Sequence, residues 1–169
     1  MSKTKTDPET LWDMIKDIRF GMLTHRHTDG RLHSHPLTTQ NKKIDEAGVL
    51  YFFVSRDSEI GRHLQQDAQV NVSYADHDKD IYISVAGRAR VNEDDDTKQR
   101  LFNALTKAWF PGGWKDPNLE LIEVAIEHAE YWNTKESKVT QLFKIAAAAA
   151  TGTQAQMGEK KELHVGHTS

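Results

Sequence analysis

The sequence predicts a mainly β fold with flanking helices, in which an antiparallel sheet forms a small closed or split barrel. Six segments carry the hydrophobic pattern of strands, and neighbouring segments are joined by polar turns, which favours antiparallel pairing over a doubly wound sheet. Helical spacing of apolar residues is found at the start, in the middle and at the end of the chain. A barrel suits this pattern, because closing a sheet removes its exposed edges.

The first predicted element is a helix. Asp7 is a suitable N-cap, and Pro8 suits the first helical position because its fixed φ matches the helix. Leu11, Ile15 and Ile18 then recur at helical spacing. We therefore expect one face of this helix to pack inward.

The strands are predicted from alternation and from short apolar runs. Residues 49–54 (VLYFFV) are continuously apolar, which is typical of a strand buried on both faces. Asp29-Gly30 predicts a tight turn between the first two strands, because Asp-Gly readily adopts positive φ. The strands are expected at residues 20–27, 32–40, 49–54, 70–75, 81–91, and 119–126 with 129–133.

Three further helices are predicted, at residues 55–67, 94–109 and 137–151. Asp94 and the two aspartates after it suit the N-terminus of the second of these helices, and Gly152 is a stop signal for the last. The remaining residues are polar. We therefore expect a barrel domain over residues 1–152 and a disordered tail over residues 153–169.

Composition excludes several classes of function. The chain has 169 residues, a net charge of −3 and no cysteine, so we expect neither a nucleic-acid partner nor a disulfide, thiolate metal site or cysteine nucleophile. Residues 1–10 lack the apolar stretch of a signal peptide, and residues 142–150 are too short to cross a bilayer. A cytoplasmic protein without a membrane partner is expected. Its hydrophobic fraction of 37% is low, which favours a dimer.

Four histidines flank the first predicted turn. His25 and His27 share one strand face, as do His33 and His35. A two-residue Asp29-Gly30 loop would put the two pairs on opposite faces, whereas a three-residue loop would put them on the same face. Because no cysteine or suitably placed carboxylate completes a ligand set, no metal site is predicted.

Several segments together resemble a known family. Their order and spacing from about Pro8 to Gly152 are similar to those of the general stress protein branch of the pyridoxamine 5′-phosphate oxidase-like FMN-binding split barrels. The matching segments are Leu11-Trp12, Met22-Leu23-Thr24, residues 30–34 leading into His35-Pro36-Leu37-Thr38, Leu50-Tyr51-Phe52-Phe53, and residues 70–75, 84–89, 108–113 and 129–132.

The resemblance implies a homodimer that holds FMN in clefts between its two subunits. The chain departs from the family pattern at His35, where an arginine is usual, and at Ile60, where a lysine is common. Both changes remove positive charge that would bind phosphate. We expect His35 to contact the phosphate as an imidazolium. The sequence leaves the choice between FMN and FAD open.

Eleven residues form the predicted cofactor site. Strand residues would flank the flavin ring, basic and hydroxyl side chains would lie where a strand opens into a helix, and two tryptophans would lie nearby. The residues are His35, Pro36, Leu37, Thr38, Phe53, Val54, Ser55, Arg56, Ser58, Trp109 and Trp132. The alternative interpretation is that the aromatic residues are core or interface and that the arginines are solvated.

The activity implied by the resemblance is a flavin-dependent oxidoreductase acting on an unknown small molecule. A non-catalytic flavin reservoir or sensor is the alternative, as is a split barrel that binds another planar ligand such as haem, a bilin or a deazaflavin. No catalytic residue, substrate or electron donor is predicted. The sequence contains no phosphate-binding loop of Walker or Rossmann type and no Gly-x-Ser-x-Gly motif.

Overall fold

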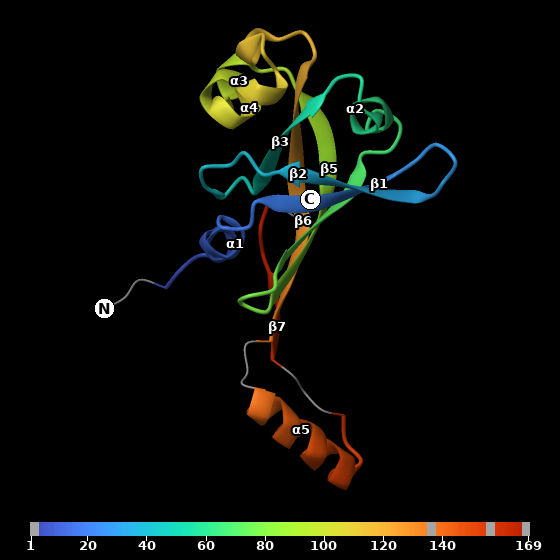
Figure 1. The fold of residues 1–169 in the computed structure, drawn as a ribbon, viewed down its shortest axis with the longest axis vertical. Helices are drawn as coiled ribbons and strands as arrows, with labels where there is room; N and C mark the ends of the chain where they lie inside the picture. Colours follow the sequence, from blue (N-terminus) through green and yellow to red (C-terminus); the bar gives the residue numbers. More distant parts are fainter. Residues whose placement is uncertain (1–3, 135–137, 155–157, 167–169) are drawn as a thin grey trace.

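Seven antiparallel strands form one curved sheet in the computed structural model, which describes residues 4–134, 138–154 and 158–166. The long strands β5 and β6 run along the molecule, with α3 and α4 at one end and α5 at the other (Figure 1). The elements are α1 (Asp7–Ile15), β1 (Phe20–Arg26), β2 (Leu32–Thr38), β3 (Val49–Ser55), α2 (Glu59–His63), β4 (Gln69–Asp76), β5 (Ile81–Asn92), α3 (Asp95–Leu101), α4 (Ala104–Trp109), the short 3₁₀ helix η1 (Gly113–Lys115), β6 (Leu119–Asn133), α5 (Lys138–Thr151) and β7 (Glu159–Leu163).

The sheet curls so that its two end strands meet. The strand order is β2-β1-β4-β5-β6-β3, and β7 pairs with β6 beside this path. Thr39, just after β2, forms a bridge to Phe52 of β3, and the Gln40 N–H donates to the Tyr51 carbonyl at 2.8 Å. The Asn41 side chain extends this contact by hydrogen bonding the β3 backbone on both sides of Leu50. The predicted antiparallel split barrel is therefore confirmed.

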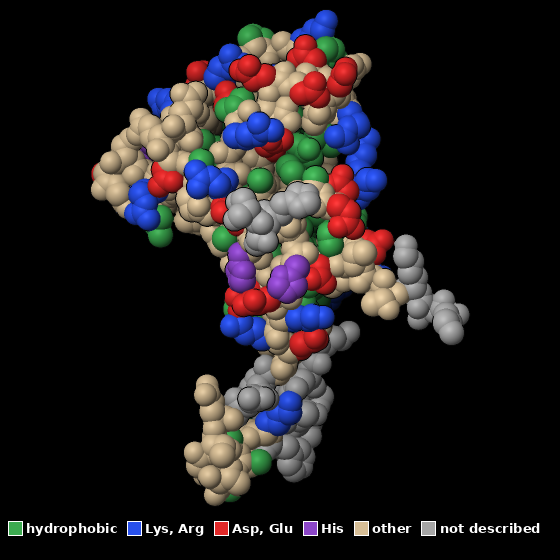
Figure 2. All heavy atoms as spheres, turned by 180° about the vertical axis from the view of Figure 1, so that it is seen from behind, with side chains coloured by type: hydrophobic (Ala, Val, Ile, Leu, Met, Phe, Trp, Pro, Cys, Tyr) green, Lys and Arg blue, Asp and Glu red, His purple; other side chains and the backbone are tan. Residues whose placement is uncertain are grey.

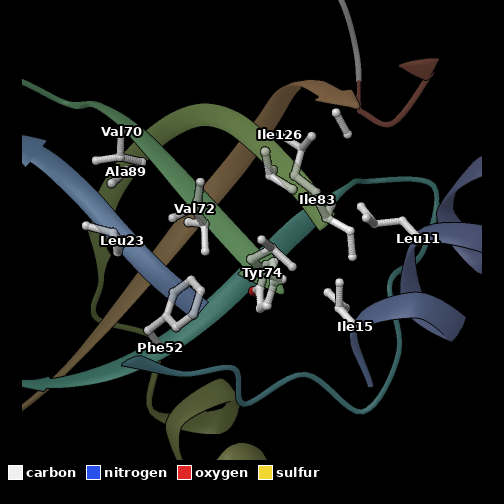
Figure 3. Close-up of a cluster of buried hydrophobic side chains, with 14 of the residues drawn as sticks. Leu11, Ile15, Leu23, Phe52, Val70, Val72, Tyr74, Ile83, Ala89 and Ile126 are labelled. Carbon is white, nitrogen blue, oxygen red and sulfur yellow. The ribbon is translucent and has the colours of Figure 1, made fainter. Parts of the chain in front are cut away.

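The core lies inside this curled sheet and under α1. Leu11 and Ile15 of α1 point into the same cluster of buried side chains that holds Leu23, Phe52 and Val72 of the strands (Figure 3). All five side chains are at most 1% exposed, so the expected inward face of the first helix is confirmed. Burial of each such side chain stabilises the fold by roughly 1.5–3 kcal/mol.

The N-cap of α1 is one residue earlier than the sequence predicts. The Thr6 side chain accepts a hydrogen bond from the Glu9 N–H, and the Glu9 carboxylate accepts one from the Thr6 N–H at 2.9 Å. This reciprocal capping box satisfies two donors at the start of the helix, which a cap at Asp7 would not do. Asp7 instead accepts a hydrogen bond from the His164 N–H at 2.7 Å.

The predicted helix over residues 94–109 is two helices. Asn103 interrupts it, because its side-chain oxygen accepts hydrogen bonds from the Leu105 and Thr106 N–H groups and so starts α4. The break turns Leu105 outward, where it is 67% exposed. The two segments predicted at 119–126 and 129–133 are one strand, β6, whose register shifts opposite Ala86 and Gly87, where Glu127 is the extra residue.

The expectation of a disordered tail is wrong for its described part. Residues 159–163 form β7 against β6, and Leu163 and Val165 are buried in the core. The segment EKKEL is too polar to be identified as a strand from its pattern, because β7 pairs only with β6 among the described strands and exposes most of its side chains. Residues 155–157 and 167–169 of the expected tail lie outside the described residues.

Helix α5 forms where the sequence predicts, although Ser137 lies outside the described residues. The helix stands apart from the barrel, beyond the ends of β6 and β7 (Figures 1 and 2). Leu142 on this helix is 66% exposed, so it does not pack against the sheet. No helix in the described part of the chain has both the length and the apolar character needed to cross a membrane.

Candidate functional site

A cavity of about 920 Å³ opens between β2, the end of β3, the start of α2, and the α3–α4 segment. This size is in the range of small-molecule sites. Nine of the eleven residues predicted from the sequence line it, so the fold brings most of the predicted site together. They are His35, Pro36, Leu37, Thr38, Phe53, Val54, Ser55, Ser58 and Trp109.

Two predicted residues do not line this cavity. The Arg56 side chain points to Glu120, with 3.6 Å between Nε and a carboxylate oxygen. Trp132, opposite Tyr82 in the sheet, lines a second hollow of about 480 Å³ over β1, β4, β5 and β6. Phe20 borders both hollows, so the second hollow adjoins the first.

Trp109 lies at the mouth of the cavity. It is 82% exposed, so core packing within the chain does not explain it. Leu105, one turn earlier on α4, also borders the cavity and is exposed. The two side chains therefore form an apolar rim that a bound ligand or a second copy could cover.

The apolar wall of the cavity is built by β3 and the break between α3 and α4. The rings of Phe53 and Phe102 pack edge to face with 6.3 Å between their centroids. Ile60 is buried beneath the cavity, where its side chain packs in the core. The position at which the family commonly has a lysine therefore contributes apolar surface here.

Three cationic side chains at the cavity were missed by the sequence analysis: Arg19, Lys42 and Arg100. Arg100 lies on α3, which ends just before the break at Asn103 that the apolar periodicity did not predict. Arg19 immediately precedes β1. The signal that could have identified Lys42 and Arg100 is their place beside or within predicted elements that carry site residues, whereas Arg19 precedes a strand that carries none.

The β1–β2 hairpin settles the question of the four histidines. Its loop has three residues, because the His27 N–H donates to the Arg31 carbonyl and Gly30 adopts a φ of 90°. His25 is therefore directly opposite His33, and the Nε2 atoms of His25 and His35 lie 3.0 Å apart. The two-residue loop is wrong, and so is the placement of the histidine pairs on opposite faces.

Burial lowers the pKa of both His25 and His35. For His35, the nearby imidazoles of His33 and His25 lower the pKa further. The surroundings of His35 therefore disfavour its charged form, the imidazolium that was expected to contact the flavin phosphate. The neutral imidazole retains one hydrogen-bond donor and one acceptor. His35 lies between the cavity and the rings of His25 and His33.

A curled antiparallel sheet with a cavity between its closing strands and a helical segment defines the chain as a split β-barrel. The chain belongs to the pyridoxamine 5′-phosphate oxidase-like family, whose sequence profile matches residues 6–156. The family predicted from the ordered motifs is therefore confirmed.

Three relatives place the chain within this fold. It is 32% identical to General stress protein 26 of Bacillus subtilis over 63 residues, which are 37% of this chain and 44% of that protein. The structure of the general stress FMN/FAD binding protein from Xanthomonas citri is 32% identical, with a TM-score of 0.67 over 77% of this chain and 90% of that one. A haem binding protein from Mycobacterium smegmatis shares the fold, with a TM-score of 0.64 and 14% identity over 98% of this chain and 60% of that one.

Proposed function

We propose that the chain binds FMN in the 920 Å³ cavity and acts as a flavin-binding protein of the general stress type. One observation carries the proposal: nine residues predicted for a flavin site line this single cavity. The similarity to the Xanthomonas citri FMN/FAD binding protein supports it.

The apolar wall suits the isoalloxazine ring. Phe53, Phe102 and Leu37 offer flat or apolar contact area, which stabilises a planar aromatic ligand by removing it from water. Asn103 and Gln40, joined by a 2.9 Å hydrogen bond, provide amide groups at the same cavity for the polar edge of the ring. The cavity thus combines the two kinds of contact that a flavin requires.

The phosphate needs partners other than those usual in the family, since His35 and Ile60 replace the expected basic residues. Arg100, Arg19 and Lys42 border the cavity and supply cations that favour a phosphate dianion. The bound flavin would supply hydride or electron transfer, and the chain would position it. Reduction of the bound flavin by NAD(P)H would distinguish an oxidoreductase from a flavin reservoir or sensor.

A homodimer is part of the proposal. Phe20, Met22 and Tyr82 are 49%, 40% and 37% exposed on the outer face of β1 and β5, beside Trp132. An apolar face of this kind is typical of an interface between subunits. Because Phe20 also borders the flavin cavity, a second copy on this face would complete that cavity. The cytoplasmic location and the absence of nucleic-acid partners remain predictions from the sequence.

Titration of purified protein with FMN and with riboflavin tests the proposal. The fluorescence of FMN should be quenched on binding. Arg100→Gln should weaken the affinity for FMN by about ten- to a hundredfold and leave the affinity for riboflavin nearly unchanged, because riboflavin lacks the phosphate. Arg88→Gln, an exposed arginine that does not line the cavity, is the matched control. The absence of FMN binding at about millimolar ligand would contradict the proposal.

Haem is a second candidate, which one observation favours. The His35 side chain borders the cavity, and imidazole is a common axial ligand of haem iron. Haem binding with a shifted Soret band that is lost in His35→Ala, together with no binding of FMN, would favour this alternative.

A further inference from the structure

Five of the nine histidines in the chain gather with one carboxylate at the far end of the β1–β2 hairpin. The hairpin and α2 lie side by side there (Figure 1). Register and helix spacing produce the cluster, because His25 opposes His33 and because Glu59 and His63 are one turn apart on α2. We call this set the histidine cluster; its members are His25, His27, His33, His35, His63 and Glu59.

The Glu59 carboxylate lies at the centre of the histidine cluster. One oxygen lies 2.9 Å from His33 Nδ1 and 3.9 Å from His35 Nε2. The other oxygen lies 3.1 Å from His27 Nε2 and 3.8 Å from His63 Nδ1. Each oxygen therefore faces two imidazole nitrogens.

Hydrogen bonds satisfy this arrangement only in part, because the Nε2 atoms of His25 and His35 are paired with each other but other atoms are not. His33 Nδ1, one oxygen of Glu59 and His63 Nδ1 are buried atoms without a hydrogen-bond partner, half of the six such side-chain atoms in the described part of the chain. His33 Nδ1 is near enough to the carboxylate for a hydrogen bond but lacks the required direction. Buried polar atoms are ordinarily paired, so this concentration of unpaired ones on both sides of the Glu59 carboxylate points to missing partners.

Cations would satisfy these atoms: one ion would be bound by His33 Nδ1 in the group with His25 and His35, and a second by His63 Nδ1 and the Glu59 oxygen that faces it. In a tetrahedral site with ligands about 2.0–2.2 Å from the metal, neighbouring ligand atoms are about 3.3–3.6 Å apart. One ligand atom from each of His25, His33, His35 and Glu59 lies within 4.8 Å of the others, and three of the six separations are 2.9, 3.0 and 3.9 Å. The cluster is therefore close to the dimensions of such a site.

The ligand types select the class of cation. Imidazole nitrogen with one carboxylate suits zinc, copper or nickel, whereas calcium and magnesium prefer oxygen ligands alone. We propose that His25, His33, His35 and Glu59 bind a divalent transition-metal ion of the zinc class. The second oxygen of Glu59, with His27 and His63, offers a further group of three ligands that depends on the same carboxylate.

The test uses the full-length chain without a histidine tag, stripped of metal by a chelator and kept free of flavin. Calorimetric titration with Zn²⁺ should give at least one ion per chain, and Co²⁺ should produce the visible absorption of a four-coordinate site. Glu59→Gln and His33→Ala should each weaken Zn²⁺ binding by at least about tenfold. Glu59→Gln preserves the size of the side chain, and His33 is accessible, with its side chain 42% exposed.

His77→Ala is the matched control. His77 is exposed on the turn between β4 and β5. This turn lies at one end of β4, whereas the histidine cluster lies near the other end, where β4 pairs with β1. It should leave Zn²⁺ binding unchanged. Circular dichroism and thermal melting of the metal-free variants show that each is folded. No Zn²⁺ binding by the wild-type chain, or equal binding by wild-type, Glu59→Gln and His33→Ala chains, would overturn the proposal; a second ion that is also lost in Glu59→Gln would support it.

Discussion

His25 and His35 lie diagonally across the β1–β2 pair, with their Nε2 atoms 3.0 Å apart and their rings stacked at an interplanar angle of 18°. His25 is buried, whereas His35 borders the cavity proposed for the flavin. His35 therefore connects the histidine cluster with that cavity. An ion in one and an anionic ligand in the other would affect each other through this contact.

Zn²⁺ is expected to strengthen FMN binding. An ion in the histidine cluster would place positive charge beside His35, near the region where the family arginine and lysine are replaced. Coupling between two sites is commonly worth a factor of five or more, so the dissociation constant of FMN should fall at least about fivefold with saturating Zn²⁺. The measurement is a fluorescence titration of FMN with and without Zn²⁺.

Glu59→Gln and riboflavin are the controls for this coupling. The variant should bind FMN with the same affinity whether or not Zn²⁺ is present, and riboflavin should respond little in either chain because it has no phosphate. Equal enhancement of FMN and riboflavin would show that Zn²⁺ acts by some route other than phosphate charge.

Loss of the Leu163 side chain is expected to destabilise the fold. Leu163 ends β7 and is 3% exposed in the core, so Leu163→Ala should lower the free energy of unfolding by about 2–4 kcal/mol. Urea denaturation followed by circular dichroism measures this change. Lys161→Ala, which removes an exposed side chain from the same strand, should change it by less than about 0.5 kcal/mol. Equal stability of the two variants would mean that β7 does not pack on the barrel in solution.

Most strands could be predicted from the sequence because burial imposes a local pattern. Residues 49–55 and 81–92 are strands because apolar side chains must face the core, and this requirement is visible in the sequence itself. β7 lacks the signal, since a mostly exposed strand beside β6 needs only Leu163 to be apolar within its five residues. The break at Asn103 was missed because a side-chain cap overrides helical periodicity.

The candidate cavity was predicted better than the histidine cluster for a physical reason. His35 to Thr38 and Phe53 to Ser55 belong to strands, so their proximity follows from the topology. The histidine cluster depends on a register that one extra loop residue reverses, because side chains alternate faces along a strand. It also depends on Glu59, which is separated from the hairpin in the sequence and reaches it only through the packing of α2.

The stability of the chain should depend on the ionisation of Glu120. Burial raises the pKa of this carboxyl, although Arg56 nearby acts in the opposite direction. A raised pKa means that the folded state holds the proton more tightly than the unfolded state, so stability falls as pH rises through the folded pKa, above the ordinary value of 4.5. Glu120→Gln cannot ionise and should show a smaller loss of stability between about pH 4 and pH 7.

Urea denaturation of wild-type and Glu120→Gln chains at several pH values in this window tests the expectation. Glu46→Gln, at an exposed position in the loop before β3, should retain the wild-type pH dependence. If the free energy of unfolding of Glu120→Gln changes with pH as much as that of the wild-type chain, the burial of this carboxyl does not govern the pH dependence of stability.

The apolar face around Met22 should hold the proposed homodimer together and thereby affect the flavin site. Met22 and Phe20 both line the second hollow, and a charge placed at Met22 would have to be buried in the interface. Met22→Glu should therefore give a monomer by light scattering and weaken FMN binding, because Phe20 borders the flavin cavity as well. Leu32→Glu, at the opposite end of the β1–β2 pair and 65% exposed, should remain dimeric and bind FMN normally. If Met22→Glu is monomeric but binds FMN with wild-type affinity, the cavity of one chain is sufficient for binding. A wild-type chain that is monomeric when loaded with FMN would contradict the homodimer.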